Sequence, residues 1–120
     1  MKKVLIIDDD EDLVGLIEHT LTWRGFSVQI LPHGLNVIDV VRHSNPDLIL
    51  LDIRLYGESG SDICQELKKR YYMPIILISG DTKKGKAFKD CGADGFLSKP
   101  FGISDLLNII NLHLKTAEMA

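Results

Sequence analysis

Five short apolar runs alternate with stretches of helical spacing along the chain. The runs are apolar at consecutive positions, which is typical of strands that are covered on both faces. Ser27 and Gln29 interrupt the second run, and this indicates a more exposed edge strand. The predicted strands cover residues 4–7, 26–31, 47–52, 75–78 and 95–98.

Apolar residues at helical spacing and capping signals predict the helices between these strands. The first helix begins near Asp10, and Gly25 stops it. Ser59-Gly60-Ser61-Asp62 resembles a capping box and opens the third helix, which runs to about Arg70. The other predicted helices cover residues 36–42, a weak stretch at 82–91 with Gly85 inside it, and a last helix from Ile103 to Leu114.

Apolar strands that are each followed by a helix predict a parallel sheet with helices on both faces. Because crossovers between parallel strands are nearly always right-handed, we expect a doubly wound, three-layer α/β fold. The 120 residues suit one domain, and the sequence contains no repeat, linker or low-complexity segment. We therefore expect a single domain over residues 1–120.

The composition is ordinary for a soluble globular protein, with 45% hydrophobic residues, 26% charged residues and a net charge of −3. No run of lysine or arginine is long enough to follow a phosphate backbone, so we expect no direct binding to nucleic acid. No stretch approaches the length of a membrane span or of a signal peptide, which favours a cytoplasmic location and no membrane contact. Cys64 and Cys91 are expected to be buried free thiols.

Charged and hydroxyl residues stand where four of the apolar runs end, namely Asp8 and Asp9, Asp52, Ser79, and Lys99. In a doubly wound sheet the ligand site lies beyond the carboxyl ends of the strands, so these residues should share one pocket. Three carboxylates packed together repel, so that one stays protonated or a cation neutralises them. Lys99 offsets one charge, and a Mg²⁺ ion suits the remaining oxygen ligands.

This set of groups fits phosphoryl chemistry. With the metal bound, one carboxylate can attack phosphorus and form an acyl phosphate. The charge of the phosphoryl group must then be spread over the metal, an ammonium group and a hydroxyl donor. Asp52, Lys99 and Ser79 supply the nucleophile and the two protein groups, while Gly80 leaves space beside Ser79.

Four segments together resemble a response-regulator receiver domain of the two-component signalling family, of the chemotaxis-regulator type, over essentially the whole chain. They are Val-Leu-Ile-Ile-Asp8-Asp9-Asp10, Leu-Ile-Leu-Leu-Asp52-Ile-Arg-Leu, Ile-Leu-Ile-Ser79-Gly80 and Gly92-Ala-Asp-Gly-Phe96-Leu-Ser-Lys99-Pro100-Phe101. The resemblance implies a five-stranded, flavodoxin-like sandwich with the strand order 2-1-3-4-5.

The resemblance also implies a role for each acidic residue. Asp52 would be the phosphorylation site, and the phosphohistidine of a histidine kinase or histidine phosphotransfer domain would be the donor. Asp9, Asp52 and the backbone carbonyl of Arg54 would bind Mg²⁺, and Asp8 would act largely through water. The phosphorylated domain would then signal an unidentified downstream effector.

The remaining roles concern the switch. Lys99 and Ser79 would stabilise the phosphoryl group, and the peptide bond before Pro100 would be cis. Ser79 and Phe96 would form the switch, in which the ring follows the hydroxyl toward the site. Phe96 lacks the hydroxyl of the tyrosine in some relatives, and Tyr56 stands where the family usually has proline.

Two other functions stay open. A Mg²⁺-dependent phosphatase or phosphotransferase with an aspartyl-phosphate intermediate places its nucleophile after the first strand in an Asp-x-Asp pattern, and Asp8-Asp9-Asp10 contains that spacing. However, the chain lacks the cap insertion of that class. A degenerate receiver would only bind partners. We expect a signalling module rather than an enzyme, and a weak homodimer through the fourth and fifth helices is among the interactions that the resemblance suggests.

Overall fold

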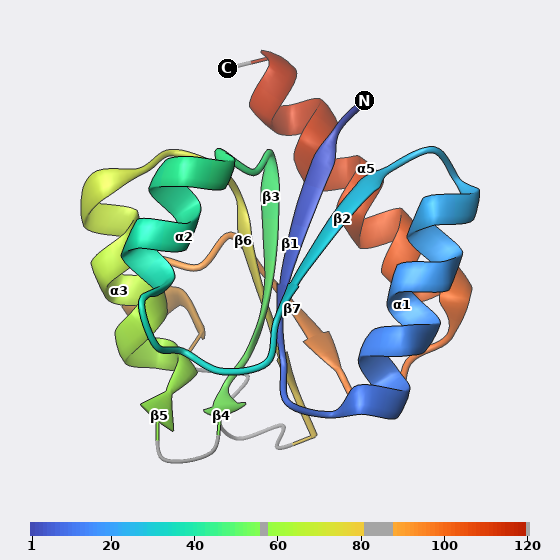
Figure 1. Cartoon of the computed structure of the whole chain (residues 1–120). Coiled ribbons are helices and arrows are strands. Elements are labelled where there is room, and N and C mark those ends of the chain that lie inside the picture. Colours follow the sequence, from blue (N-terminus) through green and yellow to red (C-terminus); the bar gives the residue numbers. More distant parts are fainter. Residues whose placement is uncertain (56–57, 81–87, 120) are drawn as a thin grey trace.

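A five-stranded parallel sheet forms the centre of the computed structural model, which describes residues 1–55, 58–80 and 88–119 (Figure 1). The sheet strands are β1 (Lys3–Ile7), β2 (Ser27–Leu31), β3 (Leu48–Asp52), β6 (Ile75–Ser79) and β7 (Gly95–Ser98). Their order across the sheet is β2-β1-β3-β6-β7. Counted in chain order within the sheet this is 2-1-3-4-5, so the predicted topology is confirmed.

The helices form the two outer layers, with α1 and α5 on one face of the sheet and α2 and α3 on the other (Figure 1). They are α1 (Glu11–Trp23), α2 (Val37–Ser44), α3 (Gly60–Arg70), the short 3₁₀ helix η1 (Phe88–Cys91) and α5 (Ile103–Met119). A small antiparallel ribbon, β4 (Arg54–Leu55) with β5 (Glu58–Ser59), lies between β3 and α3 in the sequence. No helix among the described residues is both long enough and apolar enough to cross a membrane.

Each central strand contributes to both hydrophobic cores. In β1, Val4 and Ile6 pack with α1 and α5, while Leu5 and Ile7 pack with α2 and α3. Successive strand residues point to opposite faces of a sheet. Because helices cover both faces, every position of β3 and β6 and every position of β1 after Lys3 is buried, and this explains why these strands are unbroken apolar runs in the sequence.

Most of the predicted helix limits are correct, but α5 continues to Met119, five residues beyond the predicted end at Leu114. Ser59 caps α3, because its Oγ accepts a hydrogen bond from the Asp62 amide at 3.4 Å, as the capping-box prediction required. Helix α2 continues to Ser44, two residues beyond its predicted end, and stops at Asn45, which adopts a left-handed backbone conformation (φ 49°). The predicted helix over 82–91 lies mostly outside the described residues, and its last four residues form η1.

Both cysteines are buried free thiols, as predicted. They are 27 residues apart in the sequence, but α3 and η1 bring them together, and the Cys64 Sγ donates to the Cys91 carbonyl oxygen at 3.6 Å. Burial, followed by the hydrogen bond with the Cys91 side chain, raises the pKa of the Cys64 thiol. Because only a thiolate reacts readily, this shift disfavours reaction at Cys64.

The start of α3 lies directly against the end of β3. The Gly60 amide donates to the carbonyl oxygen of Ile53 at 2.8 Å. A Cβ at position 60 would overlap the carbonyl oxygen of Asp52 and would lie 2.7 Å from the Ile53 Cα. Backbone atoms cannot move aside as a flexible side chain can, so only glycine fits between the helix and the strand end.

Replacing Gly60 with alanine should therefore destabilise the fold. We expect Gly60→Ala to lower the free energy of unfolding by about 1–3 kcal/mol, the usual cost of forcing an extra carbon into a packed site. Urea denaturation measures the change.

Gly15→Ala is the matched control, because a Cβ on Gly15 in α1 would meet nothing within 4 Å. In an open helical position alanine is favoured over glycine, so this variant should be more stable by about 0.5–1 kcal/mol. Equal effects of the two substitutions would contradict the close contact at Gly60.

Candidate functional site

The register of the sheet brings the predicted polar residues together. Ile7 of β1 is paired with Leu51 of β3, so Asp8 and Asp52 follow at the same level. The remaining strands continue this alignment, with Asp52 paired with Ile78 on β6, and Ser79 paired with Ser98 on β7. Parallel strands thus deliver their polar ends to one edge of the sheet.

Three carboxylates gather at this edge. One side-chain oxygen from each of Asp8, Asp9 and Asp52 lies within 4.8 Å of the others, an arrangement that could hold a metal ion. Asp8 and Asp52 are buried, with exposed fractions of 1% and 6%, whereas Asp9 is exposed. The cluster is therefore enclosed on the protein side and open to solvent at Asp9.

Backbone amides hold one oxygen of each buried carboxylate. The amide of Asp10 donates to the Asp8 Oδ1 at 2.9 Å, and the amide of Arg54 donates to the Asp52 Oδ1 at 3.0 Å. Both bonds reach two residues along the chain, a pattern that Asp favours in turns. They fix the orientation of both side chains.

The ammonium group of Lys99 is the cation at the site. Its Nζ lies 3.5 Å from the Asp8 Oδ2 and 3.4 Å from the Asp52 Oδ2. The Lys99 backbone amide donates to the Ser79 carbonyl oxygen at 2.8 Å, which fixes the point where the side chain leaves the backbone. Taken by themselves, these four side chains carry a formal charge of −2 when all are ionised.

The environment of Asp8 opposes its ionisation. Burial, assisted by the negative charge of Asp52, raises the pKa of Asp8 from 3.8 to about 6, although the Asp10 amide and Lys99 act in the opposite direction. The Asp8 Oδ2 is enclosed and accepts no hydrogen bond from the described part of the chain. An enclosed acceptor with excess negative charge around it fits a hard divalent cation, because such ions take oxygen ligands.

The remaining predicted residues lie around this cluster. Ser79 is buried at the end of β6, and Phe96 is half-buried and packs against the core beneath α2 and α3. The peptide bond between Lys99 and Pro100 is cis, as the resemblance implied. The side chain of Arg54 is exposed, and its backbone lies two residues after Asp52, in β4.

Sequence reasoning missed the part that Gly60 plays in this site. Gly60 holds the start of α3 against the Asp52 backbone, so it fixes the strand end that carries the central carboxylate. The sequence contained a signal for this contact, because glycine is a poor helix former and yet stands directly after a helix-capping serine. Its meaning depends on the approach of β3, which the sequence does not reveal.

The response regulator receiver domain family matches the chain over residues 4–111. That match covers most of the chain, and the chain belongs to this family. Receiver domains of two-component response regulators are signalling modules rather than enzymes of the usual kind.

Solved structures of receiver domains are similar over nearly the full length. The BeF3-activated N-terminal receiver domain of Klebsiella pneumoniae RstA is 29% identical, with a TM-score of 0.88 over 94% of this chain and 98% of that one. The Vibrio cholerae chemotaxis protein CheY4 is 26% identical, with a TM-score of 0.86 over 94% and 98%. A CheY-like receiver domain protein from Methanospirillum hungatei is 27% identical, with a TM-score of 0.91 over 99% and 98%.

The raised pKa of Asp8 makes stability depend on pH in the metal-free protein. The unfolded chain releases this proton near pH 3.8 and the folded state near pH 6, so the folded state binds more protons between these values. Rising pH therefore lowers the free energy of unfolding across this window, and the loss is complete above pH 6. Its full size is roughly 3 kcal/mol, since one pH unit corresponds to about 1.4 kcal/mol.

Asp8→Asn should remove this loss while keeping the carbonyl oxygen that accepts from the Asp10 amide. In a metal chelator at pH 7.5, we expect the variant to be more stable than the parent by roughly 2–3 kcal/mol, and at pH 4 by less than about 1 kcal/mol. Urea denaturation at both pH values gives the comparison. A gain that is equal at pH 4 and pH 7.5 would contradict the assignment.

Proposed function

We propose that this receiver domain, spanning residues 1–120, accepts a phosphoryl group on Asp52 and transmits the modification by a change of its surface. The observation that carries the proposal is the enclosed cluster of Asp8, Asp9 and Asp52 beside the ammonium group of Lys99. Asp52 ends the central strand β3, between Asp8 on one side and Ser79 on the other. It is therefore the carboxylate that lies between a candidate metal ligand, Asp8, and a hydroxyl group, Ser79.

The transfer is a displacement at phosphorus. An oxygen of Asp52 attacks the phosphorus of a phosphohistidine, the bond from phosphorus to nitrogen breaks, and its electron pair remains on the imidazole. The product on Asp52 is an acyl phosphate. The Oδ1 of Asp52 accepts a hydrogen bond from the Arg54 amide. The Oδ2 lies 3.4 Å from the Lys99 Nζ and is therefore the oxygen that we expect to react.

The added negative charge requires compensation. Asp8, Asp9, Asp52 and the backbone carbonyl of Arg54 would hold Mg²⁺. When bound, this ion would neutralise charge on the phosphoryl oxygens and fix their positions. Lys99 already lies between the two buried carboxylates, so it can follow the new charge with little rearrangement.

The switch would use Ser79 and Phe96, which lie on the adjacent strands β6 and β7, two positions apart in the register. Leu77 of β6 pairs with Phe96 of β7, two positions before Ser79 pairs with Ser98. When the Ser79 hydroxyl turns to donate to a phosphoryl oxygen, the half-buried ring of Phe96 can move deeper beside it. Phosphorylation would thereby shift an existing equilibrium between two ring positions.

Receiver domains interact with kinases or phosphotransfer proteins and with effector domains. For this chain we propose a histidine kinase or a histidine phosphotransfer domain as donor, an effector downstream, and a cytoplasmic setting. The described activation of the Klebsiella pneumoniae RstA domain by BeF3 supports an acceptor role, because beryllofluoride resembles a phosphoryl group on a carboxylate.

Incubation with Mg²⁺ and a small acyl-phosphate donor tests the proposal. Intact-protein mass spectrometry should show one phosphoryl group per chain, and the gain should be lost in Asp52→Asn and in excess chelator. Asp12→Asn is the matched control, since Asp12 is an exposed acid in the first turn of α1. It should gain the phosphoryl group as the parent does.

Two results would contradict the proposal. Continuous release of phosphate without a stoichiometric mass gain, persisting in Asp52→Asn, would indicate the phosphatase class. No mass gain in the parent would indicate a degenerate receiver that only binds partners.

A further inference from the structure

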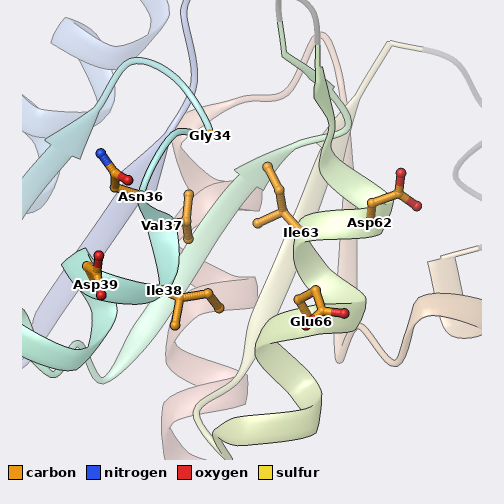
Figure 2. A pocket seen from close by; sticks show the side chains of 8 residues that line it. All are labelled: Gly34, Asn36, Val37, Ile38, Asp39, Asp62, Ile63 and Glu66. Carbon is orange, nitrogen blue, oxygen red and sulfur yellow. The ribbon is translucent and has the colours of Figure 1, made fainter.

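A groove of about 400 Å³ lies between α2 and α3, on the face of the sheet opposite α1 and α5 (Figures 1 and 2). Its floor is apolar. Val37 and Ile38 of α2 and Ile63 of α3 extend into the space between the two helices (Figure 2). Val37 is buried, whereas Ile38 and Ile63 are half-buried, so part of this apolar surface stays in contact with solvent.

The rim of the groove is acidic. Of the residues that line it, the charged ones are Asp39 on α2 and Asp62 and Glu66 on α3, and none is basic. All three carboxylates are exposed. Asp39 lies on one side of the apolar floor and Asp62 on the other, so each of the two helices that form the groove carries negative charge (Figure 2).

Two of these carboxylates form ion pairs, and both pairs are weak. Asp39 pairs with Arg42 at 2.8 Å and Glu66 pairs with Lys69 at 3.3 Å, each within its own helix and with more than half of each side chain exposed. Exposed pairs of this kind contribute little free energy, so an incoming cation can compete for the carboxylates. Asp62 makes no ion pair with any residue in the described part of the chain.

We propose that this groove binds a basic amphipathic segment of another protein. One or two large apolar side chains of that segment would cover Ile38 and Ile63, and flanking lysine or arginine side chains would reach the acidic rim. The volume suits a small number of anchoring side chains rather than a whole domain surface. The carboxylates disfavour nucleic acid, anionic lipid and acidic peptides, because each would bring like charge to the rim.

This surface is separate from the phosphoryl chemistry, so the two proposals can fail independently. None of the residues that line the groove belongs to the acid cluster or to the switch. The walls are nevertheless connected to the site through the backbone, because α3 begins at Gly60 against Asp52.

Three synthetic peptides of equal length test the recognition chemistry on the intact chain. The first is an amphipathic helix of lysine and leucine, the second replaces lysine by glutamate, and the third replaces leucine by serine. We expect only the first to bind, with amide chemical-shift changes centred on α2 and α3 in nuclear magnetic resonance spectra. Equal binding of the glutamate or serine peptide, or no binding of the lysine and leucine peptide, would overturn the proposal.

Matched double variants test the location. Asp62→Asn with Glu66→Gln should weaken binding of the first peptide about threefold to tenfold, since each exposed charge contact contributes modestly. Asp12→Asn with Glu18→Gln removes the same charge from the exposed side of α1 and should leave the affinity within twofold of the parent. Thermal unfolding confirms that both variants are folded. The same weakening in both would show a general charge effect and would refute the groove.

Discussion

The fold of this receiver domain depends at its functional edge on one ammonium group placed between two buried carboxylates. The Lys99 Nζ lies within 3.5 Å of an oxygen of both Asp8 and Asp52. Without it, both carboxylates would be enclosed with no ion pair from the described part of the chain, an arrangement that proteins rarely tolerate. Even with it the site carries excess negative charge, and the raised pKa of Asp8 is the direct expression of that excess.

The excess of negative charge at this site is useful for a signalling module. A site with too little positive charge favours the binding of a divalent cation, and in the function proposed above that cation would prepare the site for a phosphoryl group. The stability that the protein loses at Asp8 without a metal would then be recovered when a cation binds, because a ligand that binds only the folded state stabilises it. Local strain of this kind commonly marks a functional site.

The sheet supplies the positional accuracy that the electrostatics require. Asp8, Asp52, Ser79 and Lys99 meet because β1, β3, β6 and β7 run parallel and end in register. A slip of one residue would turn the buried side chains of a strand to the opposite face, so the apolar runs protect the register. Gly60 adds a second constraint by holding α3 against the backbone of Asp52.

The sequence predicted the strands and the converging polar ends well, because strands buried on both faces leave an unambiguous apolar signal. It placed the end of α2 too early, since the stop depends on Asn45 adopting a left-handed conformation that asparagine tolerates but does not require. The contact of Cys64 with Cys91 and the close approach at Gly60 were not predicted. Both depend on segments that meet only in three dimensions. The acidic groove was missed for the same reason, as its walls come from two separate helices.

The most direct test of the central claim is to locate the phosphoryl group on the chain. Borohydride reduces an acyl phosphate to an alcohol, so a phosphorylated aspartate becomes homoserine and can be identified by peptide mass spectrometry. After treatment with Mg²⁺ and an acyl-phosphate donor, we expect homoserine at position 52 alone, and none when a chelator replaces Mg²⁺. Homoserine at position 8 or 9 would contradict the account, because the nucleophile would then follow the first strand, as in the phosphatase class.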